Sequence, residues 1–398
     1  MHPELHLSEF LSDVCNFMHS KRRDSLQSVV SSCLRRESLG VTALGRGIQR
    51  DALEKHRIKQ ADRLLSNTHL LGELENLYGA IAKKVLAGVE RPVVLVDWSN
   101  LDSNERHFLL RASVPTKGRS LTIYEEVHTR QTKEKRLTHQ RFLRRLAALL
   151  PPLAKPIVVA DAGFRVTWFK AVERLGWDWV GRIRGRMKIR LAQDCSWLDG
   201  RSLHPKRYDK AIDFENVEIA RQNRLRCRLV LYKGRPKGRV LRNKFGRPSC
   251  RNRAMRGQRA NRDPFLLATS LSAAQFDALR IVRIYSSRMQ IEESFRDLKS
   301  HQYGLNLRQA RTYKTHRMSV LVAIATLSHF FSWLLGSAAQ TTKLHRHFQA
   351  NSVSASPVLS YCFLGMRLFK QRRIEIDRRS LLLARYHLPT LIACWSTT

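Results

Sequence analysis

Two short apolar runs, each followed at once by an aspartate, constrain the fold of this 398-residue chain more than any other feature. Residues 92–96 read Pro-Val-Val-Leu-Val and lead directly into Asp97, and residues 157–160 read Ile-Val-Val-Ala and lead directly into Asp161. Uninterrupted apolar runs of this length are typical of strands that are covered on both faces. The runs therefore predict two buried strands, each of which ends in a carboxylate.

The segments around these runs alternate between strand-like and helix-like patterns. The expected elements are strands at 92–96, 107–114 and 120–127, a helix at 138–150, a strand at 157–160, a helix at 166–175 and strands at 177–183, 227–232 and 265–270. A Lys117-Gly118 turn joins the second and third strands as a hairpin. This order predicts an α/β fold.

The regions on either side of this α/β part are expected to be helical. We predict a helical domain over residues 1–85, a core over residues 86–310 that a β-rich basic segment interrupts at about 184–264, and a helical region over 311–398. In the first domain, helices are expected at 28–36, 43–48 and 54–65. Two short helices around a glycine turn fit either a DNA-binding helix-turn-helix or a plain helical bundle. The basic side chains available for phosphates or base edges are Arg46, Arg50, Lys55, Arg57, Lys59 and Arg63.

The charge of the chain points to a polyanionic partner. Lys and Arg number 72 against 33 Asp and Glu, which gives a formal charge of +39 and a pI near 11.0. A nucleic acid is the expected partner, and not a membrane, because no polybasic cluster lies beside an amphipathic or lipidated anchor. Between Lys233 and Arg262, twelve of thirty residues are Lys or Arg and none is acidic. This block is either held against phosphate or simply solvated.

Three further patterns in the sequence indicate the cellular compartment and whether the chain crosses a membrane. The seven cysteines are scattered without a CxxC pair, which predicts a reducing, cytoplasmic compartment and no structural zinc. The N-terminus lacks a basic stretch followed by an apolar run, so no secretory signal is expected. Residues 318–339 are long enough to span a bilayer, but their Ser, Thr and His content favours a buried helix in an otherwise strongly charged chain.

A late segment, residues 285–299, combines a charged stripe with an apolar one if it is helical. At about 100° per residue, four side chains fall within an arc of roughly 60°: Tyr285, Arg288, Glu292 and Lys299. An apolar stripe adjoins them, formed by Ile284, Ile291, Phe295 and Leu298. Such a helix buries its apolar side and turns the charged side toward a cleft. The alternative is an ordinary solvated helix with Arg/Glu pairs four residues apart.

Three carboxylates together point to phosphodiester chemistry. Either strand-end aspartate alone reads as a cap for the following turn. Asp97, Asp161 and Glu292 together fit a different role, because two Mg²⁺ ions about 4 Å apart stabilise the attacking and departing oxygens of a phosphodiester, and Mg²⁺ prefers carboxylate ligands. We expect Asp97 to bridge both ions, with Asp161 and Glu292 each completing one side.

The order of strands and helices with Asp, Asp and Glu resembles the RNase H-like DDE transposases and retroviral integrases. The spacing Tyr-x2-Arg-x3-Glu-x6-Lys of residues 285–299 is similar to the YREK signature of the insertion-sequence four family. Four further stretches fit that family: residues 96–99, 110–114, 161–164 and 347–351. The resemblance implies an RNase H-like core with a β-rich insertion before the third carboxylate.

For function, the resemblance implies cut-and-paste DNA transposition by an endonuclease and strand-transfer enzyme of bacterial, nucleoid-associated origin. Such an enzyme binds the terminal inverted repeats, cuts through a hairpin intermediate and joins the 3′ ends to target DNA. It implies two Mg²⁺ ions, with Mn²⁺ as a substitute. It also implies a homodimer on paired ends, with residues 311–398 as a dimerisation segment.

The resemblance also assigns roles at the DNA. Tyr285, Arg288 and Lys299 hold phosphates, Met289 pushes a base from the stack, and Phe265 receives it. Many relatives carry tryptophan at that last position, and phenylalanine offers a smaller stacking face. The basic block between 233 and 262 is expected to lie against end DNA.

Two other functions fit the same residues. One is a structure-selective RNase H-like nuclease that cuts DNA without joining it. The other is a non-catalytic DNA-binding protein that kept a basic surface, against which the presence of all three carboxylates argues.

Overall fold

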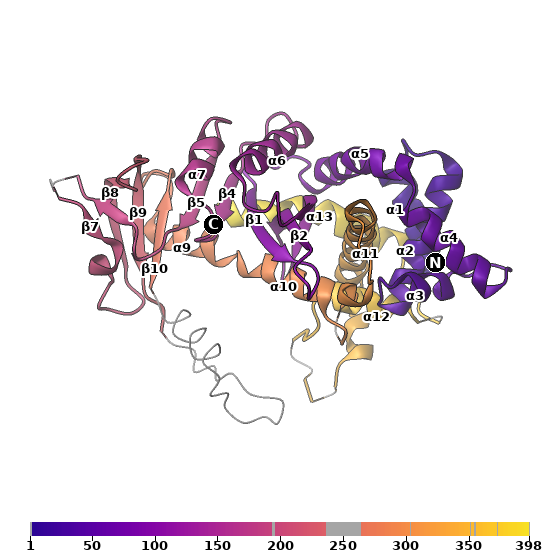
Figure 1. Cartoon of the computed structure of the whole chain (residues 1–398). Helices are drawn as coiled ribbons and strands as arrows, with labels where there is room; N and C mark the ends of the chain where they lie inside the picture. The colour runs from indigo at the N-terminus through magenta and orange to yellow at the C-terminus, as the bar shows by residue number, and fades with distance from the viewer. Residues whose placement is uncertain are drawn as a thin grey trace, which may run out of the picture. The chain divides into compact units, whose positions relative to one another are not determined.

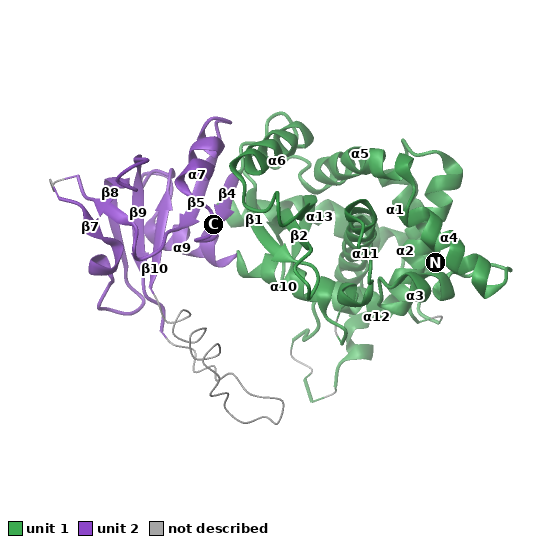
Figure 2. Ribbon diagram, viewed as in Figure 1, with its two compact units in different colours: residues 1–156, 288–398 green, residues 157–287 purple. Residues whose placement is uncertain are grey.

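A computed structural model describes residues 2–192, 196–235, 264–302, 304–350, 352–353, 356–371 and 373–397. These residues form two compact units, which Figure 2 shows in different colours. Unit 1 comprises residues 1–156 and 288–398, and unit 2 comprises residues 157–287. The mixed α/β class that the sequence predicts is confirmed.

Unit 1 is built around one long apolar helix, α11 (Thr315–Thr341). Figure 1 shows α11 surrounded by helices of the same unit. These are α1 (Pro3–Val14), α2 (Ser20–Arg36), α4 (Glu54–Leu65), α5 (Thr68–Val85), α12 (Tyr361–Phe369) and α13 (Arg378–Thr397). By length and composition α11 is the one described helix that could cross a membrane, but 89% of its most apolar window is buried inside the protein. The predicted buried helix at 318–339 is therefore confirmed.

Helices α11 and α12 pack with their backbones in direct contact. A Cβ atom added at Gly336 would lie 1.9 Å from the carbonyl oxygen of Tyr361, and one at Gly365 would lie 1.9 Å from that of Ser332. No side chain fits at either place, so both glycines are required by space. The contact fixes how far the two helices can slide along each other.

The sheet of unit 1 is an antiparallel meander. It consists of β1 (Val93–Asn100), β2 (His107–Pro115) and β3 (Ser120–Thr129), in the spatial order β3-β2-β1. Gly118 takes a φ of +84° in the predicted hairpin turn between β2 and β3. Helix α6 (Arg136–Leu149) follows, as expected.

Strand β1 is longer than its apolar run predicts. Asp97 lies inside the strand, opposite Arg111 of β2, and pairing continues as far as Asn100 opposite Phe108. The prediction that the strand ends at Asp97 is therefore wrong. The physical reason is that a partner strand extends the backbone ladder past the point where hydrophobicity stops.

Unit 2 contains the other seven strands of the described chain. They are β4 (Ile157–Ala160), β5 (Asp178–Arg182), β6 (Lys188–Arg190), β7 (Leu198–Asp199), β8 (Ala211–Ile219), β9 (Leu225–Tyr232) and β10 (Phe265–Thr269), in the order β4-β5-β10-β9-β8-β6-β7. Helix α7 (Val166–Glu173) connects the parallel pair β4 and β5. The predicted order of strand, strand, strand, helix, strand, helix, strand is confirmed. The strands β6 to β9 supply the expected β-rich segment before residue 264.

The segment 285–299 is not one helix. It is divided between α9 (Ala278–Ser286) and α10 (Met289–Lys299), with Ser287 and Arg288 between them. The hydroxyls of Ser286 and Ser287 donate to the carbonyls of Val282 and Ile284 at 2.7 and 2.6 Å. Serine side chains that bond back to preceding carbonyls compete with the helical ladder, and this pattern accounts for the break.

The break corrects one part of the predicted stripe. Tyr285 belongs to α9 in unit 2, whereas Arg288 is the N-cap of α10 in unit 1, so the two do not belong to one continuous helix. Three members of the apolar stripe, Ile291, Phe295 and Leu298, are buried on α10 as predicted, whereas the fourth, Ile284, is buried on α9.

The N-terminal helices of unit 1 form as predicted. Helices α2 and α4 and the short α3 (Val41–Gly47) cover the three expected segments. Helices α3 and α4 approach closely, since a Cβ added at Gly45 would lie 2.3 Å from the Cα of Ile58. The helix-turn-helix and the domain boundaries near residues 85 and 310 remain predictions.

Candidate active site

Arg288 joins the first and third predicted carboxylates. Its Nη1 donates to Asp97 Oδ2 at 2.9 Å, and its Nη2 donates to Glu292 Oε1. The side chains of Asp97 and Arg288 are 13% and 15% exposed, whereas that of Glu292 is 40% exposed. Two carboxylates from distant parts of the chain therefore face one guanidinium within unit 1.

The backbone elements explain this meeting. Glu292 stands in the first turn of α10, four residues after Arg288, which is the spacing of neighbours on a helix surface. Helix α10 packs against β1, so its first turn reaches Asp97. The backbone N–H of Trp98 donates to Asp97 Oδ1 at 2.8 Å and fixes the carboxylate further.

Lys299 lies at the other end of α10 and also reaches β1. Its Nζ donates to Ser99 Oγ at 2.8 Å and to the carbonyl of Asn100 at 3.3 Å. Burial, together with the nearby charges of Arg308 and Arg111, lowers the pKa of Lys299. Three of the four signature residues, Arg288, Glu292 and Lys299, are therefore gathered along β1 with Asp97.

Met289, the first residue of α10, directly follows Arg288 in the chain. Its side chain is 49% exposed, which is unusual for a large apolar residue in this protein. Its predicted role in displacing a base stays a prediction.

A buried ion pair lies beneath these residues. Arg111 Nε donates to Glu125 Oε2 at 2.7 Å, and the two side chains are 4% and 1% exposed. Glu125 Oε1 also accepts from the hydroxyls of Tyr78, at 2.9 Å, and Thr326, at 2.5 Å. The Arg111 guanidinium carbon lies 5.0 Å from the ring centroid of Phe295 on α10. The pair thus ties α5, β2, β3, α10 and α11 together.

Sequence reasoning missed this ion pair. The available signal was Arg111 in the strand-like run 107–114 and the adjacent Glu125 and Glu126 in the run 120–127. Buried charges in such runs need partners.

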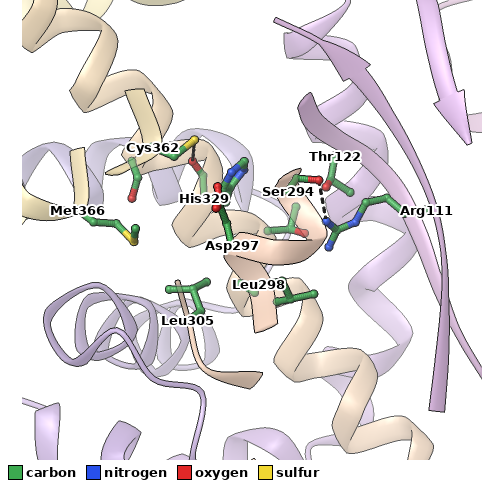
Figure 3. Close-up of a pocket in the computed structure, with 12 residues that line it drawn as sticks. Arg111, Thr122, Ser294, Asp297, Leu298, Leu305, His329, Cys362 and Met366 are labelled. Atoms are coloured by element: carbon green, nitrogen blue, oxygen red, sulfur yellow. Dashed lines mark hydrogen bonds between the residues drawn. The ribbon is translucent and has the colours of Figure 1, made fainter. Parts of the chain in front are cut away.

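A small cavity lies under α10, next to the ion pair (Figure 3). Arg111 donates to Ser294 Oγ at 3.4 Å on one side, and Asp297 and His329 lie on the other. Two buried polar atoms at this cavity, His329 Nε2 and Ser332 Oγ, have no hydrogen-bond partner within the described part of the chain.

The burial of His329 beside this cavity makes the free energy of unfolding depend on pH. Burial, helped by Arg111 and Arg119, lowers the pKa of His329 from 6.5 to about 3. Between these two pH values the unfolded chain binds a proton at this residue that the folded chain does not, so stability falls as pH drops from about 6.5 toward 3, by up to about 1.4 kcal/mol per pH unit. We expect His329→Gln to flatten this dependence in thermal unfolding between pH 7 and 4. The same change at the exposed His19 should leave the slope as it is.

In unit 2, Asp161 follows β4 directly, as predicted. Its Oδ1 accepts from the backbone N–H of Gly163 at 2.8 Å. A Cβ added at Gly163 would lie 3.0 Å from that oxygen, so glycine leaves room for the carboxylate. This local bond is the turn-capping role expected of a lone strand-end aspartate.

Unit 2 also brings two predicted DNA-contacting residues together. The rings of Phe265 and Tyr285 meet edge to face, with centroids 5.2 Å apart. The guanidinium carbon of Arg182 lies 5.3 Å from the centroid of Phe265. Tyr285 is buried and Phe265 is partly exposed, so the phenylalanine is the more accessible face of this pair.

The carboxylates of the site are oxygen donors of the kind that a divalent metal ion needs. Within the described ranges, no three His, Cys, Asp or Glu side chains are grouped so as to hold one. Unit 1 nevertheless gathers Asp97 and Glu292 around a single positive charge, that of Arg288. Two hard oxygen donors that converge on a cation are of the kind that Mg²⁺ or Mn²⁺ takes in proteins. The donor chemistry therefore fits a divalent metal.

Part of the expected DNA surface lies outside the described residues. This applies to the basic block from 236 to 262 and to Asn351 of the stretch 347–351.

Comparison with known proteins gives a family. A family model described as "Transposase DDE domain" matches residues 89–328, which include all three predicted carboxylates and the whole segment 285–299. No curated protein matches the chain. Because the match covers more than half of the sequence, the chain belongs to the transposase DDE domain family, whose members are enzymes that cut and join DNA.

Proposed function

We propose that this transposase is of the insertion-sequence four (YREK) type and moves DNA by cutting and pasting it through a hairpin intermediate. The observation that carries the proposal is the grouping of Arg288, Glu292 and Lys299 with Asp97 along one strand. Their spacing matches the YREK signature, and the motifs at 96–99, 110–114 and 161–164 are similar to those of the transposase of transposon ten. The element order from β1 to β5 supports an RNase H-like core.

The three carboxylates would hold the metal. Asp97, Asp161 and Glu292 supply hard oxygen donors, and the proposed cofactor is a pair of Mg²⁺ ions for which Mn²⁺ substitutes. When bound, such ions activate the attacking water or 3′ hydroxyl and stabilise the departing oxygen.

The cations of the site bind the strand that is cut. Arg288 offers a planar guanidinium that suits phosphate oxygens, and it already lies between the carboxylates. Lys299 is held by Ser99 and Asn100, which aims its ammonium along β1. We assign both to phosphates of the transposon end.

A flipped base is proposed to use the aromatic pair and Met289. Hairpin formation bends one strand sharply, and removing a base from the stack relieves that bend. Phe265 presents an aromatic face next to Tyr285 and Arg182, which suits stacking. The exposed side chain of Met289 is the proposed wedge.

The wider assembly is also part of the proposal. The partner is double-stranded DNA, first the inverted repeats and then the target, and two copies of the chain act on paired ends. The helices of residues 1–85 and the basic block from 233 to 262 are assigned to end binding, and residues 311–398 to dimerisation. The formal charge of +39 supports this extensive contact with DNA. The proposed location is the bacterial cytoplasm, at the nucleoid.

One assay tests the reaction class. Purified protein is incubated with labelled DNA from the ends of the inverted repeats that flank the reading frame, with Mg²⁺ and a target plasmid. We expect nicked ends, hairpins and joined products on denaturing gels. Nicks without hairpins or joined products would establish a nuclease instead, and DNA binding without any cleavage would establish a non-catalytic protein.

A substitution at Lys299 is expected to affect the hairpin steps more than first-strand nicking. We expect Lys299→Ala to slow hairpin formation and reopening about tenfold more than first-strand nicking, because a sharply bent strand needs its phosphates held. Single-turnover rates for each step measure this difference. The matched control is Arg296→Ala, in the same turn of α10 but 66% exposed, which should alter neither step. Equal losses in both steps would contradict the role of Lys299 in the bent strand.

A further inference from the structure

We infer that the tip of the β2–β3 hairpin sets the position of α10, and that Gln290 is the positioning residue through which it acts on Glu292 and Arg288. This inference rests on the proposed function, since it assigns a purpose to the alignment of those two side chains. Gln290 lies between them in the chain, in the first turn of α10.

The side-chain amide of Gln290 forms two hydrogen bonds with the backbone of Thr116. Its Nε2 donates to the carbonyl of Thr116 at 2.9 Å, and its Oε1 accepts from the backbone N–H of Thr116 at 2.9 Å. The side chain therefore pairs with the hairpin as a neighbouring strand would. Such a two-point contact fixes orientation as well as distance.

Thr116, which Gln290 binds, is itself held by two further hydrogen bonds. The hydroxyl of Thr116 donates to the carbonyl of Arg119 across the turn, and it accepts from Trp333 Nε1 at 2.9 Å. Trp333 belongs to α11 and is fully buried. The hairpin tip is thus anchored to the central helix of unit 1.

A second contact holds the same helix further along. Arg119 Nε donates to Asp297 Oδ2 at 2.6 Å, and its guanidinium also lies 3.8 Å from Glu293. The hairpin therefore contacts α10 at its first turn through Gln290 and near its last turn through Arg119. Two contacts about two turns apart prevent the helix from rotating or tilting on the sheet.

The first turn of α10 needs this support. The helix is interrupted between α9 and α10, so α10 does not continue a preceding helix. Its N-cap residue is Arg288, whose side chain has no acceptor atom with which to cap the first N–H groups of the helix. The amide of Gln290 supplies the fixed point that a cap would otherwise give.

The test is Gln290→Met, which keeps the length of the side chain and removes both hydrogen bonds. We expect the melting temperature and the affinity for end DNA to stay near their wild-type values. We expect the first-strand cleavage rate at saturating DNA to fall about 10- to 100-fold, because a shift of about 1 Å in a catalytic group costs on that order. The Mn²⁺ concentration that half-saturates the protein, measured by electron paramagnetic resonance, should rise about tenfold.

Two further variants sharpen the result. Arg296→Ala, on the same helix, should change neither the rate nor Mn²⁺ binding. Arg119→Met combined with Gln290→Met should cost less than the product of the two single effects, because both residues fix one helix. Backbone amides of residues 289–293 should exchange hydrogen faster in Gln290→Met than in the wild type.

The outcomes separate the two proposals. A Gln290→Met protein with wild-type cleavage and wild-type Mn²⁺ binding overturns the positioning role, as does a rate loss explained wholly by weaker DNA binding or by unfolding. A wild-type protein that leaves end DNA intact overturns the proposed function, while the Mn²⁺ titration and hydrogen exchange still judge Gln290 by themselves.

Discussion

Glu292→Gln, Asp97→Asn and Asp161→Asn are each expected to lower metal-dependent strand cleavage by about 1,000-fold or more, a loss of about 4 kcal/mol in transition-state stabilisation. Each change replaces an anionic oxygen by an amide of the same shape, so the fold and the phosphate contacts remain. Single-turnover cleavage of a labelled transposon end in Mg²⁺ measures the loss, and a filter-binding assay measures the affinity for the same DNA.

The chain offers a matched control for the glutamate. Glu293 is the next residue on α10, and it pairs with Arg119 and Arg296 instead of with Arg288. Glu293→Gln should cleave at close to the wild-type rate, because Arg119 keeps its closer contact with Asp297 and so still holds α10. Undiminished cleavage by any of the three carboxylate variants would remove that residue from the proposed metal site.

Breaking the buried ion pair is expected to have the largest effect on stability. Arg111→Met leaves Glu125 as an unpaired charge in the core, and Glu125→Met does the same to Arg111. Each should cost about 3–5 kcal/mol of unfolding free energy. The double variant should regain most of this loss, because two apolar side chains of similar volume need no partner. Urea unfolding followed by tryptophan fluorescence gives the four values of the double-mutant cycle.

The contrast with an exposed pair gives the control. Arg46 and Glu54 form an ion pair whose side chains are more than half exposed. Arg46→Met should hardly move the unfolding midpoint, since solvent screens such pairs. A double variant no more stable than the single ones would show that Arg111 and Glu125 act separately.

Local pattern was enough for much of the fold. Apolar runs placed β1, β4 and the long helix α11, and periodicity placed the buried side of α10. These features depend on residues close in sequence, so their signals survive without any knowledge of the tertiary structure. Likewise, the spacing of Arg288 and Glu292 is a property of one helical turn.

The rest depended on partners that sequence does not reveal. The extension of β1 past Asp97 requires β2 beside it. Gln290 binds the backbone of Thr116, and a backbone contact does not depend on which residue supplies it, so the sequence gives no signal of it. The break before Arg288 comes from two serine hydroxyls, which also occur inside intact helices. Each of these features arises from a long-range or conformational choice that periodicity does not record.

The discontinuity of unit 1 has a consequence for the order in which the protein is made. Ribosomes release Asp97 and its sheet early, then the whole of unit 2, and only afterwards Glu292 and the helix α11 that fills unit 1. A chain still in synthesis therefore has the first carboxylate but neither the third nor the core beneath it. If the proposed site is right, competence to cut DNA arises only after Glu292 and α11 have been made.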